Sequence, residues 1–351
     1  LYVNLTEKVV NNTWYRGKIN DEGQNVWIHS SYLTKSVEKQ TIYTATLNQA
    51  LTKQMSLSTP PQTDLHRNKP AYVRKSDLKK NSGSKYKVVA QNGANVYSQT
   101  NTNSRIWGRI AYDEEVEVIK TSGSWHEIKY GTWRNASESE VRQYLNPNNN
   151  KFQHLVLSHS IGVSASDLNK ILKGKGILEG KGQAFIDGAR KHKVNEIYLM
   201  SHAFLETGHG TSKLANGIEV GKNKKTGNLE LVTNSNRNNL SNIRKTYNMF
   251  GIGAIDEDPD RFGAIRAYQE GWFSPEEAII GGAKFVGEGY INHPTYKQDT
   301  LYKMRWNPAN PGTHQYATDI GWAVKQANMI ERYYKQVNSP TMTFDISVYR
   351  E

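Results

Sequence analysis

One apolar segment that ends in a carboxylate constrains this chain more than any other feature. Residues 201–212 have the sequence SHAFLETGHGTS, and a further apolar run precedes them. Because these residues include few polar positions, they predict a helix that is buried on almost every face. The other elements must then pack around this helix. Gly208 and Gly210 predict the end of this helix, which places Glu206 where a cleft can reach it. Glu206 is therefore a candidate proton donor; the alternative is a residue that caps or pairs near a helix end.

The charge balance limits the partners of this chain. Its 351 residues include 45 Lys and Arg against 33 Asp and Glu, which gives a formal net charge of +12 and a pI near 9.4. The excess predicts a negatively charged partner, either nucleic acid or a polyanionic polymer or surface. The length allows about two domains.

Cysteine is absent from the sequence, which argues against a disulfide scaffold and a thiolate metal site. This composition is compatible with secretion by a Gram-positive bacterium. Because no run of about 18 apolar residues occurs, we expect no membrane span. The chain begins at Leu1 without a basic and apolar leader, and we expect it to be a fragment or a processed piece.

Residues 1–146 contain short apolar runs broken by Asn, Gly and Ser, which predict the strands of small β-barrels. Residues 26–33 (VWIHSSYL) resemble residues 71–78 (AYVRKSDL), and residues 13–15 (TWY) resemble residues 124–126 (SWH). This self-similarity indicates SH3-like units in tandem, the first of them truncated. A single irregular β domain is the alternative.

A basic segment lies within this region. Such a run is usually a solvated face, but the interleaved Tyr and Trp residues would also suit a polyanion. No nucleic-acid motif accompanies it, so we rank a polyanionic polymer ahead of nucleic acid. The cations lie close together with only Asp77 among them: Arg67, Lys69, Arg74, Lys75, Lys79, Lys80, Lys85 and Lys87.

Helical patterns follow a polar stretch at residues 146–150 (NPNNN), which predicts a domain boundary. Helices are predicted at 166–172 and 183–192. Ser274, Pro275 and the following glutamates are typical of a helix start. A last helix is predicted over residues 319–337, with one apolar face: Ile320, Ala323, Ala327, Ile330, Tyr334 and Val337.

Two polar segments follow the Glu206 helix. Residues 216–245 are rich in Lys, Asn and Gly and predict a loop, either one that closes over a substrate or plain disordered surface. Residues 255–260 (IDEDPD) form an acidic cluster, in which Pro259 restricts Asp258 to extended conformations. A calcium loop is an alternative interpretation of this cluster, although it lacks an EF-hand pattern.

Two carboxylates brought to one cleft are what the hydrolysis of a glycosidic bond requires. Glu206 suits proton donation to the leaving oxygen. Asp256 or Asp258 suits the second role, in which a carboxylate stabilises the oxocarbenium-like charge or directs a water. Aromatic side chains that could stack on sugar rings are also present, although several must belong to the core: Tyr247, Tyr268, Trp272, Tyr290, Tyr296 and Trp306.

Five motifs resemble a known enzyme family. Residues 201–212 and 247–252 (YNMFGI) look like the glucosaminidase domain of glycoside hydrolase family 73. Residues 281–286 (GGAKFV), 300–308 (TLYKMRWNP) and 311–319 (PGTHQYATD) are similar to the C-terminal part of the staphylococcal bifunctional autolysins. These matches cover about residues 150–351. Residues 1–146 resemble, more loosely, the GW-type repeat that precedes the enzyme in those proteins.

The resemblance implies a multidomain protein. Residues 1–146 would be an all-β, SH3-like (GW-type) region that binds the cell wall, and residues 147–351 a mainly α, lysozyme-like catalytic domain. The implied activity is that of an endo-β-N-acetylglucosaminidase on peptidoglycan glycan strands, with no cofactor and no metal. The family also implies attachment to teichoic or lipoteichoic acid rather than nucleic acid. The implied location is the bacterial cell wall surface after secretion, and the implied roles are wall turnover and daughter-cell separation.

The resemblance also carries over to single residues. Glu206 matches the catalytic acid, and Tyr290 matches the family tyrosine after the later helix. Many family members carry the second carboxylate on a β-hairpin lobe after the FGI motif, but here that segment is short and offers the 256–260 acids, of which Asp256 and Asp258 are the candidates. The expected substrate-binding residues are Thr207, Gly208, Tyr247, Asn248, Phe250, Tyr268, Tyr290, Tyr296 and Trp306.

Two alternatives remain open at this point. The acetamido group of the substrate can itself act as the nucleophile, in which case Glu206 alone would be indispensable. The chain could also be a wall-adhesion protein that binds teichoic acid, with secondary or absent hydrolase activity, although the presence of Glu206 argues against inactivity.

Overall fold

The computed structural model describes residues 2–9, 12–18, 25–29, 36–255, 258–337 and 341–351. Its internal contacts divide the chain into two compact units. The first unit combines Leu1–Ile42, Asn150–Met304 and Val324–Val348, and the second combines Tyr43–Asn149, Arg305–Ala323 and Tyr349–Glu351. The longest segments of the two units meet at Asn149 and Asn150, inside the predicted polar stretch. Each unit is nevertheless assembled from separate parts of the chain.

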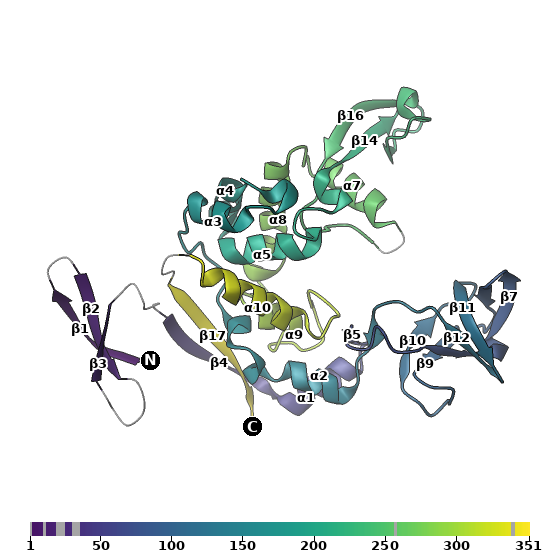
Figure 1. Ribbon diagram of the computed structural model, residues 1–351, viewed down its shortest axis with the longest axis horizontal. Helices are drawn as coiled ribbons and strands as arrows, with labels where there is room; N and C mark the ends of the chain where they lie inside the picture. Colours follow the sequence, from purple (N-terminus) through teal and green to yellow (C-terminus); the bar gives the residue numbers. More distant parts are fainter. Residues whose placement is uncertain (1, 10–11, 19–24, 30–35, 256–257, 338–340) are drawn as a thin grey trace. The chain divides into compact units, whose positions relative to one another are not determined.

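The first unit contains most of the helices, and Figure 1 shows α3, α4, α5 and α8 as a cluster. The helices predicted at 166–172, 183–192 and 319–337 are confirmed to within a few residues. The α helices from residue 150 onward are α3 (Ala165–Leu172), α4 (Gly182–His192), α5 (Glu196–Thr207), α6 (Lys213–Asn216), α7 (Pro259–Gln269), α8 (Pro275–Val286), α9 (Leu301–Trp306) and α10 (Trp322–Tyr334).

Helix α5 lies in the core of this unit. Its residues from Glu196 to Phe204 are all buried, which confirms the predicted burial. Asn195 caps the start of the helix by accepting a hydrogen bond from the amide of Tyr198. Gly208 ends the helix with φ 55°, a left-handed conformation in which glycine avoids the cost of a Cβ. The last turn of α5 is therefore the part of the helix that reaches the surface.

Helix α8 packs closely on α4, because small residues let the two backbones approach. A Cβ built on Gly188 of α4 would lie 3.1 Å from the Cβ of Ala283 and 3.3 Å from the Cα of Ile280. The predicted start of α8 is confirmed, since the Ser274 side chain accepts a hydrogen bond from the amide of Glu277, and Pro275 occupies the first turn.

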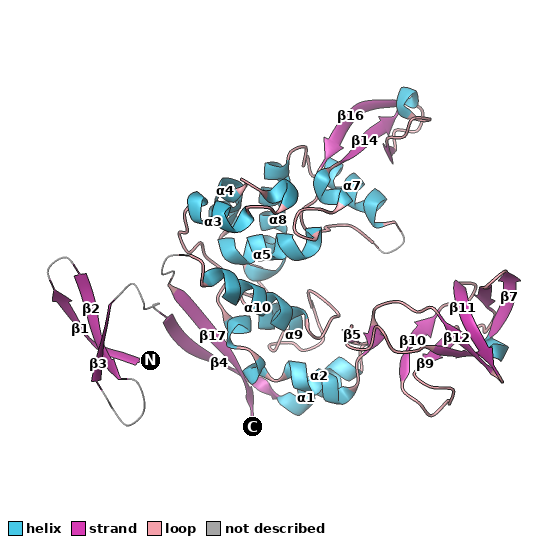
Figure 2. Cartoon of the chain, in the orientation of Figure 1, coloured by secondary structure: helices cyan, strands magenta, loops and turns pink. Residues whose placement is uncertain are grey.

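The segment predicted as a polar loop, residues 216–245, is instead largely a small sheet. Strands β14 (Ile218–Asn223), β15 (Leu229–Leu231) and β16 (Leu240–Thr246) pair antiparallel in the order β15-β14-β16. Ile218 and Val220 point to one face and pack with Ala264 of α7, which covers the sheet (Figure 2). The prediction was wrong because polar residues dominate the turns, while the apolar alternation within each strand is only two or three residues long.

Two further strands, far apart in the sequence, pair with each other. Strand β4 (Ser36–Thr46) pairs with β17 (Met342–Arg350). The buried Asp345 of β17 accepts hydrogen bonds from Thr41 at 2.6 Å and from Lys303 at 2.6 Å. The protein thus has a β-rich N-terminal portion and a helical C-terminal region. The description of the C-terminal region as mainly α fits only in part, because it also contains β14 to β17.

The second unit is built around a seven-stranded sheet in the order β10-β9-β6-β12-β11-β8-β7. Its core contains Val73, Val88, Val96, Trp107 and Ile128. Two helices, α1 (Leu47–Met55) and α2 (Glu138–Leu145), pack on each other. The strands are β6 (Tyr72–Arg74), β7 (Leu78–Ser82), β8 (Lys85–Val88), β9 (Ala94–Tyr97), β10 (Ile106–Ile110), β11 (Glu115–Ser122), β12 (Trp125–Ile128), and a separate pair, β5 (Gln62–Thr63) and β13 (Arg134–Asn135).

The sequence self-similarity has a counterpart in strand pairing. Strands β1 (Tyr2–Val9), β2 (Asn12–Lys18) and β3 (Asn25–His29) form an antiparallel sheet in which Trp14 pairs with His29. In the larger sheet, Trp125 of β12 pairs with Arg74 of β6. The two similar segment pairs align Trp14 with Trp125 and His29 with Arg74. The same register therefore occurs twice, although the chain order of the paired strands is reversed.

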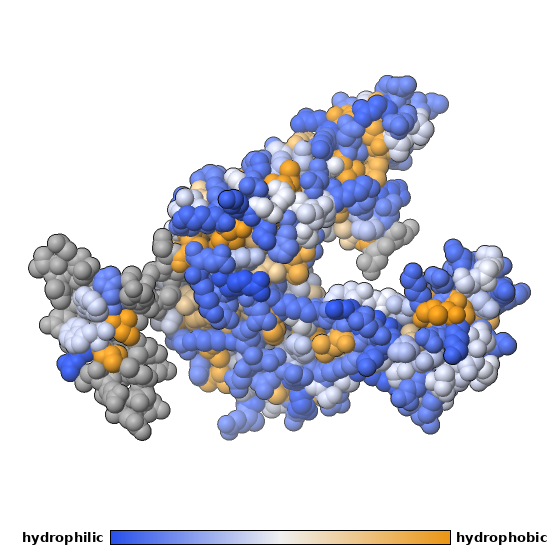
Figure 3. Space-filling model, viewed as in Figure 1, coloured by the Kyte–Doolittle hydropathy of each residue, from blue (hydrophilic) through white to orange (hydrophobic). Residues whose placement is uncertain are grey.

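On the face seen in Figure 3, the coloured residues are mainly hydrophilic, with apolar areas scattered among them. On the seven-stranded sheet, the large exposed apolar side chains include Ile106 and Ile119. Among the residues that the structure describes, none of the helices combines the length and the apolar character needed to cross a membrane.

Candidate active site

Glu206 lies in the last turn of α5. Its side chain is 32% exposed, whereas the helix residues from Glu196 to Phe204 are buried. The turn that follows is closed by Thr207, whose hydroxyl donates to the carbonyl of Ala203 at 2.6 Å and accepts from the amide of Gly210 at 2.7 Å. Gly208, His209 and Gly210 all have positive φ. The chain therefore turns sharply past Glu206 and leaves one side of its carboxylate open to solvent.

Two buried residues lie below Glu206 on the same helix face. His202 is one turn earlier, and its Nε2 is 3.5 Å from Oε1 of Glu206. Tyr198 is a further turn earlier, and its hydroxyl is 3.2 Å from Nδ1 of His202. Both side chains are fully buried. Burial raises the pKa of Tyr198 well above its usual value, and the charges of Glu206 and Tyr290 add to this effect, so Tyr198 is a neutral hydroxyl.

The YNMFGI motif packs against Glu206 from a separate part of the chain. Asn248 is buried and shapes this turn: its Oδ1 accepts hydrogen bonds from the amides of Phe250 and Ile252, and its Nδ2 donates to the carbonyl of Ile252. Gly251 has φ 62°, and a Cβ built on it would lie 3.4 Å from Oε2 of Glu206. The motif thus places Gly251, which has no side chain, directly beside the Glu206 carboxylate.

The ring of Phe250 packs against His202, the residue one turn before Glu206. It meets the His202 imidazole edge to face, with the ring centroids 5.4 Å apart. Gly282 of α8 makes room for this ring, because a Cβ there would overlap Phe250. The neighbouring Gly281 makes room for Trp272 in the same way. Gly282 of the GGAKFV motif therefore allows Phe250 to lie against His202.

Tyr290 lies in a π-helical turn, Gly287–Ile291, that continues α8. Its side chain is half-buried, and burial raises its pKa. Its ionised form would raise the pKa of Tyr198, so Tyr290 lies near Tyr198, which is two turns before Glu206 on α5. Its ring is 6.3 Å from that of the exposed Phe285. The structure thus places this predicted aromatic residue near Tyr198 and Phe285.

In the acidic cluster, the aspartates that the structure describes make contacts within the fold. Asp256 lies outside the described residues. Asp258 is the N-cap of α7, and its Oδ1 accepts a hydrogen bond from the amide of Arg261 at 3.2 Å. Asp260 forms an ion pair with Lys213 at 2.8 Å. Both described aspartates therefore have a structural contact of their own.

The remaining predicted binding residues differ in accessibility. Tyr247 is half-buried beneath the ammonium of Lys245, and the hydroxyl of Tyr268 donates to the carbonyl of Asn242 in the β14–β16 lobe. Tyr296 is half-buried beside His293, with the ring centroids 4.7 Å apart. Trp306 is fully buried and offers no ring face to a sugar. Thr207, Gly208, Asn248 and Phe250 shape the turns beside Glu206 as described above.

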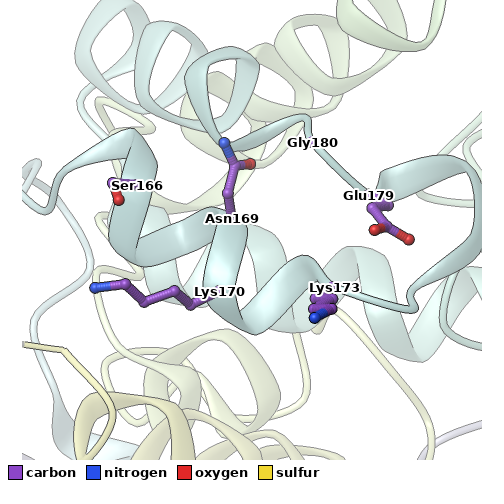
Figure 4. A pocket seen from close by; sticks show the side chains of 6 residues that line it. All are labelled: Ser166, Asn169, Lys170, Lys173, Glu179 and Gly180. Atoms are coloured by element: carbon purple, nitrogen blue, oxygen red, sulfur yellow. The ribbon is translucent and has the colours of Figure 1, made fainter.

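An open hollow of about 640 Å³ lies elsewhere on the first unit, beside α3 (Figure 4). Two of its polar lining residues form hydrogen bonds with the backbone. Asn169 accepts a hydrogen bond from the amide of Gly182, and Glu179 accepts one from the amide of Gly174. Across the described part of the chain, no three His, Asp or Glu side chains are grouped so as to hold a metal ion.

No role was predicted from the sequence for Tyr198, His202 or Gly251. A signal for the first two was present, because residues 198, 202 and 206 are spaced by four and must share one face of a helix. The contact of Gly251 with Glu206 had no such signal, since it depends on how two distant segments pack.

Comparison with known proteins gives consistent matches. A family described as glucosaminidase, mannosyl-glycoprotein endo-beta-N-acetylglucosaminidase, matches residues 182–335. The chain is 43% identical over 319 residues to a beta-N-acetylglucosaminidase of Bacillus subtilis (strain 168), a match that covers 89% of the chain. It is 36% identical over 347 residues, or 99% of its length, to a bifunctional autolysin of Staphylococcus aureus (strain NCTC 8325 / PS 47).

A solved structure agrees with these sequence matches. The crystal structure of a major bifunctional autolysin superposes with a TM-score of 0.52 at 31% identity, covering 90% of this chain and 100% of the other. The chain spans 32% of the length of the Bacillus protein and 22% of that of the staphylococcal protein.

Proposed function

This chain belongs to the glucosaminidase family represented by the bifunctional autolysins, and we propose that it is an endo-β-N-acetylglucosaminidase that hydrolyses peptidoglycan glycan strands. The observation that supports this most directly is the Glu206 carboxyl, which has His202 and the Gly251 turn close by on one side and is open on the other. A carboxyl in such a position can protonate a glycosidic oxygen as the bond to the sugar breaks.

Glu206 is the general acid in this proposal. Its proton passes to the leaving oxygen, and the electron pair of the cleaved bond stays with that oxygen. Tyr290, which lies near Tyr198, is proposed to contact the sugar that bears the developing charge, because it offers an aromatic ring and a neutral hydroxyl. Tyr247 and Tyr296 are the further half-buried aromatic residues that we propose for sugar binding.

The second catalytic group is proposed to be the acetamido group of the substrate. The contacts of Asp258 support this, because a carboxylate that caps a helix is held by the backbone of its own chain. The alternative is a protein carboxylate at Asp256 or Asp258, and Asp258 is tested separately below. Glu206 is required in both routes.

The N-terminal portion is proposed to bind the wall through SH3-like (GW-type) units. The repeated register, Trp14 with His29 and Trp125 with Arg74, supports two copies of one strand arrangement. The net charge of +12 favours an anionic polymer such as teichoic or lipoteichoic acid as the ligand. The proposed location is accordingly the bacterial cell wall surface, where the enzyme would act in wall turnover and in the separation of daughter cells.

The decisive experiment is to digest purified peptidoglycan with the full chain, reduce the products and identify their terminal sugar by mass spectrometry. Reduced N-acetylglucosamine is expected at the new ends. Reduced N-acetylmuramic acid would make the enzyme a muramidase. If no new ends form while the protein still sediments with walls, the adhesion protein without hydrolase activity becomes the better account.

A further inference from the structure

We propose that His202 is a positioning residue for the reaction, which holds Oε1 of Glu206 so that Oε2 presents the catalytic proton. The inference rests on the proposed role of Glu206 and adds a group that the proposed mechanism does not contain. Its basis is the line of Tyr198, His202 and Glu206 along one face of α5, in which the first two side chains are fully buried.

The arrangement selects one tautomer of His202. The Tyr198 hydroxyl has a single hydrogen to donate, and it lies 3.2 Å from Nδ1 of His202 and 3.9 Å from Sδ of Met304. An imidazole nitrogen is a much better acceptor than a thioether sulfur. Donation to Nδ1 leaves the histidine hydrogen on Nε2, which points at Glu206. The raised pKa of Tyr198 supports this, because the hydroxyl keeps its hydrogen.

His202 is rigid enough to act in this way. Its imidazole is packed between the Phe250 ring, 5.4 Å away, and the Tyr198 ring, 5.5 Å away. Phe250 in turn occupies the space that Gly282 leaves open. An exposed Glu side chain populates several rotamers, so a fixed donor at one of its oxygens narrows the orientation of the other.

The Nε2 to Oε1 distance of 3.5 Å is long for a hydrogen bond. Catalytic hydrogen bonds in ligand-free sites are commonly long and tighten when the substrate binds. Oε2 lies on the side of Gly251, where there is no side chain to cover it. In the reaction, the proton on Oε2 moves to the glycosidic oxygen, the Glu206 carboxylate forms, and His202 keeps its own proton and stabilises the new charge.

Two amide substitutions test this assignment. The amide nitrogen of glutamine can reach the position of Nε2, whereas that of asparagine reaches only the position of Nδ1. With His202→Gln, kcat should stay within about threefold of the wild-type value, because a donor to Oε1 is kept. With His202→Asn, kcat should fall about 10- to 100-fold with KM unchanged, as expected for a mispositioned acid. Thermal melts of both variants check that they fold.

If the Gln and Asn variants lose kcat equally, His202 is a packing residue and the proposal is wrong. A purely structural role would also lower stability and activity together, without separating kcat from KM.

A measurement on the unaltered protein covers the case in which the variants do not fold. With ¹⁵N-labelled histidine, NMR reports which ring nitrogen carries hydrogen, and His202 should be the Nε2–H tautomer. An Nδ1–H tautomer would overturn the proposal. Because this readout needs no activity, it is independent of the sugar analysis: an inactive wild-type protein would refute the proposed function and leave the tautomer question to be answered on its own.

Discussion

A Cβ built on Gly251 would lie 3.4 Å from Oε2 of Glu206, although the two residues are 45 positions apart in the sequence. The backbone there has φ 62°, in the left-handed region that favours glycine. The glycine thus serves two purposes, since it permits the turn and keeps a side chain away from the carboxylate.

The first prediction concerns this contact. Gly251→Ala should cost about 1 kcal/mol of stability from backbone strain and should lower kcat by a larger factor than that loss explains, because the methyl group would lie in van der Waals contact with Oε2 and cover it. Gly227→Ala is the matched control: it also has positive φ, 76°, and its Cβ would meet only Lys222 Cε at 3.6 Å. Comparable melting temperatures with unequal kcat values are expected. Equal activity in the two variants would contradict the close approach.

The second prediction concerns the acid itself. Glu206→Gln keeps the size of the side chain and removes the proton, so the rate of peptidoglycan cleavage should fall about 100- to 10,000-fold. Glu331→Gln removes from α10 the carboxylate of an exposed ion pair with Lys335, and this variant should cleave normally. New reducing ends formed by the Glu206 variant at nearly the wild-type rate would remove Glu206 from the mechanism.

The third prediction separates two roles of Asp258. Asparagine caps a helix about as well as aspartate, so Asp258→Asn should melt normally. Asp258→Ala should lose about 0.5 to 2 kcal/mol of stability through the lost cap. If the substrate acetamido group assists the reaction, the Asn variant should also keep its activity. A stable Asn variant with strongly reduced kcat would instead identify Asp258 as the second catalytic carboxylate.

The sequence was sufficient to predict the elements whose patterns are local. The burial of α5, its end at Gly208 and the Ser274 cap of α8 all follow from neighbouring residues. The β14–β16 lobe was missed because the turn composition masked short alternations such as Ile218 and Val220.

The site was less predictable than the helices. Glu206 stands out by its position at the end of an apolar helix, but aromatic residues of the core and of a cleft have the same local pattern. Trp306, expected to contact sugar, is fully buried, whereas Tyr290 is half-buried. The fit of Phe250 into the space at Gly282 could not be predicted either, because it depends on how two distant segments pack.

The fourth prediction concerns acid stability of the second unit. Glu140 accepts hydrogen bonds from Arg105 at 2.6 Å and is 2.5 Å from His66. Burial opposes its ionisation, but the hydrogen bonds from Arg105, His66 and Ser137 outweigh burial and lower its pKa to about 2.

The direction of the pH effect on stability follows from the difference between the Glu140 pKa in the folded chain and that in the unfolded chain. The unfolded chain binds this proton at higher pH than the folded chain, so the contribution of Glu140 to stability is present above about pH 4.5 and is lost as the pH falls toward 2. The loss is on the order of 2 to 3 kcal/mol. Unfolding by urea between pH 5 and 2 should show it, and Glu140→Gln should be less stable at pH 5 and should show a flatter dependence. If the free energy of unfolding depends equally on pH in both proteins, other groups cause the loss of stability in acid.

The last prediction concerns the cations of β7 and β8. Within the described residues, Lys85 and Lys87 form ion pairs with Glu115 at 2.8 Å and with Asp113 at 2.9 Å, whereas Lys79 and Lys80 have no carboxylate partner. A cation already paired with a carboxylate has less to gain from a second anion. We therefore expect the double variant Lys79→Gln/Lys80→Gln to bind lipoteichoic acid more weakly than Lys85→Gln/Lys87→Gln, which lowers the net charge equally.

Binding should be measured against salt, because each lost ionic contact lowers the slope of log affinity against log salt by roughly one. Equal losses in the two variants would mean that net charge, rather than the cations of β7, determines wall binding, and no dependence on salt would point to recognition of glycan or peptide.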